Sequence, residues 1–253
     1  MTIRIAHVSD LHLGAHDPAA VETLASDVAA AQPTLTVVTG DLTMRARPAQ
    51  FRQAAALIER LPAPRLVVPG NHDIPLFAVG ARLVRPYQRY RSAICEDLDP
   101  LVRAPGVTAL GLNSMARVRW KNGGVTRKQA ATVVDALAGE PVCVLALHHP
   151  PFAGGLSRLV GRSRLARAMA EAGVHLALAG HTHVPDARLV ELAAGGRAHR
   201  LVAVTAGTAT SRRVRGTARS WSLIDVEPGA VVVRERYHLG GGWRLGRTVS
   251  FPR

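Results

Sequence analysis

The chain has 253 residues, of which 47% are hydrophobic and 20% charged, so it is long enough for one large globular domain and too apolar for a disordered or fibrous protein. Its two cysteines exclude a disulfide scaffold and a zinc–thiolate site, and no apolar run reaches the ~20 residues that span a bilayer. A formal net charge of +14, almost all of it from arginine, suits an anionic partner such as nucleic acid, a phosphorylated metabolite or an anionic lipid, although genome composition alone would explain it equally well.

The first nine residues predict a buried strand that runs directly into Asp10. They contain no signal-peptide pattern. Together with the low cysteine count, this predicts a cytoplasmic protein.

Strand and helix signals alternate from residue 17 to residue 179. Asp17 and Pro18 are the residue types preferred at the N-cap and first position of a helix, and Thr126 begins a capping-box pattern. Helices are expected to begin near residues 17, 48, 126 and 163, and strands to cover 34–39, 65–68, 107–112, 142–147 and 174–179. Residues 74–105 predict a helix and loops.

Beyond residue 186 the helical period vanishes, and the chain predicts a series of strands separated by glycine-rich turns. These strands are expected at 187–192, 198–206, 219–226, 230–238 and 243–250. The continuous apolar strands that precede them predict a parallel sheet covered on both faces, and the terminal strands suggest a second sheet packed against it. Because no repeat or linker is visible, we expect a single α/β domain over residues 1–253.

Side chains that can bind metals follow five of the expected strands. They are Asp10 and His12 after the first strand, Asp41 after the second, Asn71 after the third, His148 after the strand ending at residue 147, and His181 and His183 after the strand ending at residue 179. Open α/β sheets bind ligands at the carboxyl ends of their strands. We therefore expect these groups to converge on one crevice.

The donor types fit two divalent metals. Seven candidate ligands are too few for two six-coordinate ions unless a carboxylate and a hydroxide bridge them, and Asp41, alone on its loop, is the expected bridging carboxylate. Oxygen and imidazole ligands without thiolate favour Mn, Fe or Zn. Such a centre keeps about one net positive charge, which favours an anionic substrate such as a phosphate ester.

Five motifs in this order resemble those of the calcineurin-like metallophosphoesterase superfamily. They are Asp10-Leu11-His12, Gly40-Asp41, Gly70-Asn71-His72-Asp73, His148-His149-Pro150 and Gly180-His181-Thr182-His183, and the resemblance spans residues 3 to about 185. It implies a four-layer αββα sandwich of two mixed sheets flanked by helices. It also implies a dinuclear metal centre, at which a metal-bridging hydroxide attacks the phosphorus.

The resemblance further implies roles for individual residues. One metal would be held by Asp10, His12, Asp41 and His183, and the other by Asp41, Asn71, His148 and His181. His148 rather than His149 matches the spacing of the ligand, and His149 is expected to line the substrate pocket or orient its neighbours. His72 is similar to a family histidine that contacts the phosphate and protonates the leaving oxygen, so His72 and Asp41 are the expected catalytic residues.

One position departs from two subfamilies. Three residues after Asp41, protein phosphatases of this superfamily carry an aspartate and purple acid phosphatases a ligand tyrosine, whereas this chain has Met44. Both subfamilies are therefore disfavoured, and His72 lacks an obvious orienting carboxylate. The remaining motifs look more like the bacterial branch of cyclic-nucleotide and glycerophosphodiester phosphodiesterases.

Further substrate contacts are expected around the metals. Arg212 and Arg213 lie in a loop rich in Thr, Ser and Gly after a strand, where they could touch a phosphate or a lipid headgroup or remain a solvated surface. The expected substrate-binding residues are Asn71, His72, His149, Arg212 and Arg213.

The sequence thus predicts a dinuclear metal-dependent phosphodiesterase for a cyclic nucleotide-like or glycerophosphodiester-like substrate. Alternatives are a pyrophosphohydrolase for a sugar-nucleotide lipid or a nucleotide diphosphate, with peripheral contact to an anionic membrane, and a nuclease. Nucleic acid is the less favoured partner because only 4% of residues are aromatic, so stacking surfaces are scarce. A non-catalytic scaffold would be expected to have lost ligands that are all present here. The oligomeric state stays open.

Overall fold

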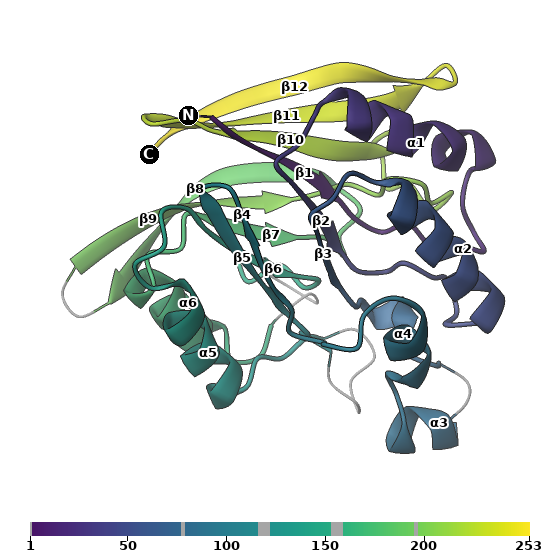
Figure 1. Ribbon diagram of the computed structural model, residues 1–253, viewed down its shortest axis with the longest axis horizontal. Helices are drawn as coiled ribbons and strands as arrows, with labels where there is room; N and C mark the ends of the chain where they lie inside the picture. The colour runs from purple at the N-terminus through teal and green to yellow at the C-terminus, as the bar shows by residue number, and fades with distance from the viewer. Residues whose placement is uncertain (1, 77–78, 116–121, 153–158, 195–196) are drawn as a thin grey trace.

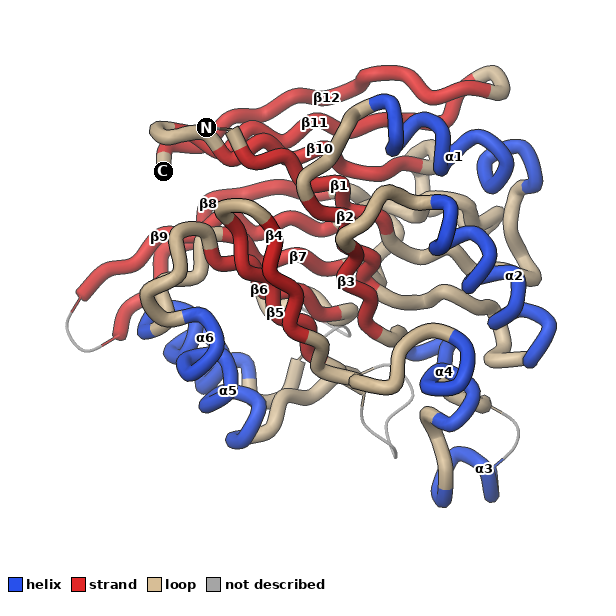
Figure 2. Tube along the Cα trace, in the orientation of Figure 1, coloured by secondary structure: helices blue, strands red, loops and turns tan. Residues whose placement is uncertain are grey.

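Two six-stranded sheets lie face to face in the computed structural model, which describes residues 2–76, 79–115, 122–152, 159–194 and 197–253 (Figure 1). The first sheet contains, in spatial order, β12 (Gly242–Pro252), β11 (Ala230–Leu239), β10 (Ser220–Val226), β1 (Ile3–Val8), β2 (Leu35–Thr39) and β3 (Arg65–Val68). The second contains β4 (Leu101–Ala104), β5 (Val107–Leu112), β6 (Cys143–Leu147), β7 (Leu176–Ala179), β9 (Arg197–Thr205) and β8 (Asp186–Ala194). Helices cover the outer faces of both sheets (Figure 2).

Both sheets are mixed. In the first, β1, β2 and β3 run parallel, and β10 pairs antiparallel with β1. In the second, β5, β6, β7 and β9 run parallel, and the edge strands β4 and β8 are antiparallel to their neighbours. The predicted α/β architecture of two mixed sheets flanked by helices is confirmed.

The expectation that the terminal strands form a sheet of their own is wrong. β8 and β9 extend the sheet of β5, β6 and β7, whereas β10, β11 and β12 extend the sheet of β1, β2 and β3. Each terminal group therefore completes one of two sheets that the earlier strands had begun. The strand pattern locates strands but carries no signal for which neighbour each one pairs with.

The sequence also missed β4, which lies in the stretch expected to hold a helix and loops. This strand has only four residues, at the edge of its sheet, and its side chains alternate between exposed and half-buried. So short and exposed a strand lacks the apolar run that identifies buried strands.

The helices pack on the sheets through apolar faces. α1 (Pro18–Ala30) and α2 (Pro48–Arg60) cover the first sheet, with Leu24 and Phe51 buried against Val38. α5 (Arg127–Leu137) and α6 (Arg162–Glu171) cover the second, with Val133 and Leu165 in its outer core. A third apolar cluster fills the space between the sheets. α3 (Val79–Val84) and α4 (Gln88–Ala93) follow β3, and α4 contacts α2.

The predicted helix starts agree with the structure. Asp17 accepts a hydrogen bond from the backbone N of Ala20 (3.1 Å), and Thr126 accepts one from the backbone N of Gln129 (3.1 Å). Among the described residues, no helix combines the length and apolar character needed to cross a membrane.

Candidate metal centre

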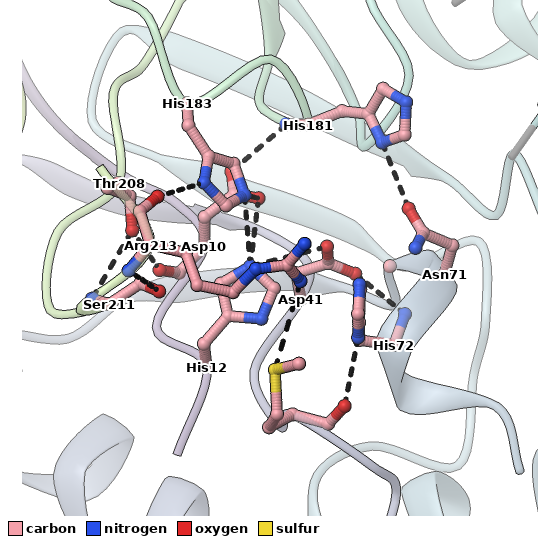
Figure 3. A network of polar contacts seen from close by, with 12 residues as sticks. Asp10, His12, Asp41, Asn71, His72, His181, His183, Thr208, Ser211 and Arg213 are labelled. Atoms are coloured by element: carbon pink, nitrogen blue, oxygen red, sulfur yellow. Dashed lines mark hydrogen bonds and ion pairs between the residues drawn. The ribbon is translucent and has the colours of Figure 1, made fainter. Parts of the chain in front are cut away.

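The structure brings together the seven predicted metal-binding side chains, although the loops that carry them follow strands of two different sheets. Asp10 and His12 follow β1, Asp41 follows β2, and Asn71 begins a short 3-10 turn after β3, all in the first sheet. His148 follows β6, and His181 and His183 follow β7, in the second sheet. The site therefore lies where the carboxyl ends of the parallel strands of the two sheets meet (Figure 3).

Four of these residues form one compact donor cluster. Asp10, His12, Asp41 and His183 are all buried, and each offers one ligand atom within 4.8 Å of the others. His12 Nε2 lies 3.0 Å from His183 Nε2 and 3.6 Å from Asp41 Oδ2, and His183 Nε2 lies 3.1 Å from Asp10 Oδ1. This is the set that the motif resemblance groups on one metal.

A second cluster lies directly beside the first. Asn71 Oδ1 lies 2.9 Å from His181 Nδ1 and 3.1 Å from His148 Nε2, and the two ring nitrogens are 3.2 Å apart. His148 Nε2 is also 3.5 Å from Asp41 Oδ2, the oxygen that faces His12. One carboxylate oxygen of Asp41 thus adjoins both clusters.

The donor atoms fit cations better than they fit one another. A ring nitrogen that carries no proton presents a lone pair, so neighbouring imidazoles at 3.0–3.2 Å cannot all be satisfied by hydrogen bonds among themselves. Asp10 Oδ1 is buried and forms no hydrogen bond, although ring nitrogens of His183 and His12 lie 3.1 Å and 3.6 Å from it. Buried polar groups of this kind are normally satisfied or bound to a metal. The cluster therefore indicates a divalent-metal site.

Backbone conformation aims the ligands inward at an energetic cost. Five candidate ligands have left-handed φ angles, namely Asp10 (54°), His12 (49°), Asp41 (51°), His181 (73°) and His183 (62°). Such angles are rare outside glycine, cost about 1–3 kcal/mol each, and concentrate at functional sites. They are held by bonds between loops, such as the one from His12 N to the Asp41 carbonyl (2.8 Å).

Two motif glycines allow these loops to pack together. A Cβ on Gly180 would lie 1.9 Å from Ser9 Oγ and 2.5 Å from Asp10 Oδ2. A Cβ on Gly70 would lie 2.1 Å from the backbone N of Asp41. No side chain can be accommodated at either position without moving a carboxylate ligand.

Neighbouring groups orient the candidate ligands. His148 Nδ1 is 2.7 Å from the Thr39 carbonyl, and His183 Nδ1 is 2.7 Å from the Arg213 carbonyl, so both rings turn Nε2 toward the centre. Ser9 Oγ donates to Asp10 Oδ2 at 2.6 Å. Sequence reasoning missed the two carbonyl partners, since a backbone carbonyl has no residue-specific signature.

The electrostatics keep both carboxylates ionised. Burial by itself would raise the pKa of Asp41, but the adjacent His148, His72 and His12 hold that pKa well below its ordinary value. The pKa of Asp10 is also lowered, because His12 and His183 outweigh its burial. Anionic oxygens at both positions are what divalent cations require.

His72 lies beside the clusters rather than within them. Its Nδ1 is 2.9 Å from the Met44 carbonyl, its backbone N donates to Asp41 Oδ1 (2.8 Å), and its ring centroid is 4.8 Å from that of His12. The backbone carbonyl of Met44 thus orients His72 in place of the carboxylate that the sequence lacks.

The remaining predicted contacts differ in position. His149 is fully buried, with Nδ1 2.9 Å from Ser114 Oγ and its ring 4.7 Å from that of His181. Arg213 is exposed and lines a groove of about 430 Å³ that opens on Asn71 and His72. The other residues lining the groove are Met44, Arg45, Ile74 and Leu76, which sequence reasoning did not identify. Arg212 is exposed and does not line the groove.

Comparison with known proteins agrees with the geometry. The family model of the calcineurin-like phosphoesterases matches residues 3–185. A cAMP/cGMP dual specificity phosphodiesterase of Mycobacterium tuberculosis is 26% identical over 97% of this chain and 82% of its own length. A probable cyclic nucleotide phosphodiesterase of Synechococcus is 27% identical over 72% of this chain and 74% of its own length.

Among solved structures, a purple acid phosphatase from yellow lupin seeds superposes on all of this chain with a TM-score of 0.70 at 12% identity. The chain spans 54% of the length of that enzyme, and at this identity the likeness shows the fold alone. The match over residues 3–185 covers strands β1 to β7 and every donor of the metal cluster, and the five strands β8 to β12 lie beyond it. The chain therefore belongs to the calcineurin-like phosphoesterase family and is a metal-dependent hydrolase of phosphate esters.

Proposed function

We propose that the chain hydrolyses a phosphodiester at a centre of two divalent ions. The observation that carries this proposal is the pair of adjoining donor clusters that share Asp41 Oδ2. In this assignment one ion is held by Asp10, His12, Asp41 and His183, and the other by Asp41, Asn71, His148 and His181. The imidazole, carboxylate and amide donors suit Mn, Fe or Zn.

Two such ions, when bound, act as Lewis acids that lower the pKa of a water molecule and polarise the phosphoryl oxygens. The chain positions the reacting groups. Ser9, Thr39 and the Arg213 carbonyl hold the ligands in place, and the left-handed backbone of the loops fixes their direction. Most of the rate in phosphoryl transfer comes from such positioning and charge stabilisation.

His72 supplies a proton to the leaving oxygen in this proposal. Its Nδ1 is occupied by the Met44 carbonyl, which leaves Nε2 as the atom that can exchange a proton with substrate. The backbone N of His72 donates a hydrogen bond to Asp41 Oδ1, which fixes the residue beside the carboxylate that both clusters share. General acids held in this way contribute about 10²–10⁴ to the rate.

The similarity to two cyclic nucleotide phosphodiesterases, at 26% and 27% identity, supports a cyclic nucleotide-like phosphodiester as substrate. A glycerophosphodiester-like substrate has the same bond to be cleaved. Hydrolysis of nucleotide diphosphates or single-stranded DNA would need the same metals, so a substrate panel distinguishes these activities.

The test is hydrolysis of bis(p-nitrophenyl) phosphate by protein reconstituted with Mn, followed by the same assay on cyclic AMP, glycerophosphocholine, ADP-ribose and single-stranded DNA. We expect turnover that is lost in Asp41→Asn together with bound metal, measured by elemental analysis. A metal-loaded protein that cleaves none of these diesters would contradict the proposal.

A further inference from the structure

Part of the loop between β9 and β10 lies against the first ligand loop of the candidate metal centre. We call residues 208–213 of this loop the clamp segment; they lie beyond the part of the chain that the family model matches. Three of its side chains are buried, namely those of Thr208, Thr210 and Ser211. Figure 3 shows the segment on the side of the centre that holds Asp10 and His183.

Two hydroxyls of the clamp segment bond backbone carbonyls of the first ligand loop. Thr208 Oγ1 donates to the Asp10 carbonyl (2.7 Å), and Thr210 Oγ1 donates to the Leu11 carbonyl (2.5 Å). Asp10 and Leu11 are fully buried, and a buried carbonyl without a donor is costly. The ladder between β1 and β10 ends at His7, so the carbonyls that follow need donors from elsewhere. The two threonines supply them.

These hydroxyls also fix two ligands in an unfavourable backbone conformation. Asp10 and His12, on either side of Leu11, have φ angles of 54° and 49°, which persist only where the surroundings enforce them. Their backbone N–H groups bond the loop after β2, at the carbonyls of Gly40 (3.0 Å) and Asp41 (2.8 Å). The clamp segment bonds the carbonyls of the same turn, so the first ligand loop is held from two sides.

The same segment orients a third ligand, which comes from the other sheet. His183 Nδ1 lies 2.7 Å from the Arg213 carbonyl. Ser211 connects this carbonyl to the hydroxyl of Thr208, because its backbone N donates to Thr208 Oγ1 (3.3 Å) and its Oγ accepts from the backbone N of Arg213 (3.0 Å). One short segment therefore positions ligands on loops of both sheets.

The second donor cluster has other supports. His148 is oriented by the Thr39 carbonyl (2.7 Å). Among the described residues, no hydrogen bond joins the clamp segment to the side chains of Asn71, His148 or His181. A change in the clamp segment is therefore expected to act mainly on the cluster that contains Asp10, His12 and His183.

We propose that Thr208 and Thr210 are positioning residues that set the affinity of the first ion, the one assigned to Asp10, His12, Asp41 and His183. The proposal rests on the two-ion centre of the proposed function and adds to it residues from the part of the chain beyond the family match. Both hydroxyls act through the backbone of the first ligand loop. Residues that position metal ligands typically contribute about 10–100-fold to metal affinity.

The test replaces each threonine by valine, which keeps the shape of the side chain and removes its hydroxyl. Titration with Mn, followed by elemental analysis, should show one of the two ions bound about 10–100-fold more weakly in Thr208→Val and in Thr210→Val. At Mn concentrations that saturate wild type, the electron paramagnetic resonance signal of a coupled Mn pair should give way to that of a single ion.

Two further variants separate positioning from general destabilisation. Thr210→Ser keeps the hydroxyl and should retain the wild-type affinity for both ions. Thr108→Val is the matched control, because Thr108 is also buried and its Oγ1 donates to Glu140 (2.8 Å) at the amino end of β5. It should bind both ions as wild type does.

Hydrogen exchange gives a readout that needs no metal. In EDTA-treated protein, the amides of residues 10–13 should exchange faster in both valine variants than in wild type or Thr108→Val. These amides bond the loop after β2, and they keep those bonds only while the turn is held in its left-handed conformation.

Three results would overturn the proposal while leaving the proposed function intact. They are wild-type affinity for both ions in the valine variants, an equal loss of affinity in Thr108→Val or Thr210→Ser, and unchanged exchange at residues 10–13. A wild-type protein that binds fewer than two Mn ions and cleaves no diester would instead contradict the proposed function, and the exchange measurement would still test the clamp segment.

Discussion

At the scale of single residues, His72 is distinguished from the neighbouring histidines by what its ring nitrogens face. In His72, as in His148 and His183, Nδ1 faces a backbone carbonyl. Nε2 of His148 and of His183 lies 3.5 Å and 3.1 Å from an aspartate oxygen, whereas none of the ion pairs among the described residues involves His72. The residue type alone predicts a role in the site. Its orientation by the carbonyl of Met44 could not be predicted, since any residue at that position offers the same carbonyl.

His72→Ala is expected to lower kcat by about 10²–10⁴, because the leaving oxygen loses its proton donor. Bound metal should stay at the wild-type amount, since the ring lies outside both donor clusters. Turnover of bis(p-nitrophenyl) phosphate and elemental analysis on the same samples check this. Loss of metal in the variant would mean that His72 is a ligand rather than a proton donor.

Gly180→Ala is expected to weaken metal binding, because the added Cβ would lie 1.9 Å from Ser9 Oγ and 2.5 Å from Asp10 Oδ2. The carboxylate of Asp10 must then move. Changes to residues that position a metal ligand typically lower metal affinity about 10–100-fold. Gly229→Ala is the control, because a Cβ there meets no atom within 4 Å. Titration with Mn, monitored by activity, should give a weaker metal affinity for Gly180→Ala than for Gly229→Ala. Equal affinities of the two variants would contradict the packing argument.

At the scale of elements, the sequence predicted most helices and strands because the apolar period and the caps are local properties. It failed at β4, where burial is too slight to leave a pattern, and at the pairing of the terminal strands. Pairing depends on contacts such as Arg4 on β1 with Asp225 on β10, which are 221 residues apart. No local window contains that information.

The ion pairs of Asp225 connect three strands of the first sheet. Its buried carboxylate accepts hydrogen bonds from Arg4 on β1 (2.8 Å) and from Arg234 on β11. Burial would raise the pKa of Asp225, but the two arginines lower it below its ordinary value. A carboxyl whose pKa is lower in the folded state stabilises the fold above its unfolded pKa of about 3.9, and loses that contribution as pH falls through the folded value.

Asp225→Asn should therefore destabilise the protein at neutral pH, by about 1.5–3 kcal/mol for the lost charged hydrogen bonds. The difference from wild type should shrink as the pH falls from about 5 toward the lowered pKa. Urea unfolding at a series of pH values measures it, with Asp135→Asn on the exposed face of α5 as the control. A difference that does not vary with pH would contradict the assignment.

At the scale of the whole molecule, the metal centre joins the two sheets. The first sheet supplies Asp10, His12 and Asp41 to the compact cluster, and the second supplies His183. Without a cation, buried carboxylates and lone pairs face one another across this junction on loops with strained φ angles.

Removal of metal by chelation is therefore expected to lower Tm, and addition of Mn to restore it. Ligand binding at 100 times Kd adds about 2.7 kcal/mol to the free energy of unfolding. Calorimetry with and without EDTA checks this, and Asp41→Asn should show a much smaller shift because it binds metal poorly. A wild-type Tm that is insensitive to chelation would indicate that the junction is stable without cations.

The sequence by itself determined which side chains of this protein can bind metal, where each stands after its strand, and the family to which their order belongs. These are properties of residue type and local period, which are read directly from the chain. The tertiary structure decided how the strands are divided between the sheets, which carbonyls orient His72 and His183, and that Arg45 and Arg213 face one groove. Those features arise from contacts between segments that are far apart in the sequence. Several of these contacts are made by backbone carbonyls, which every residue has.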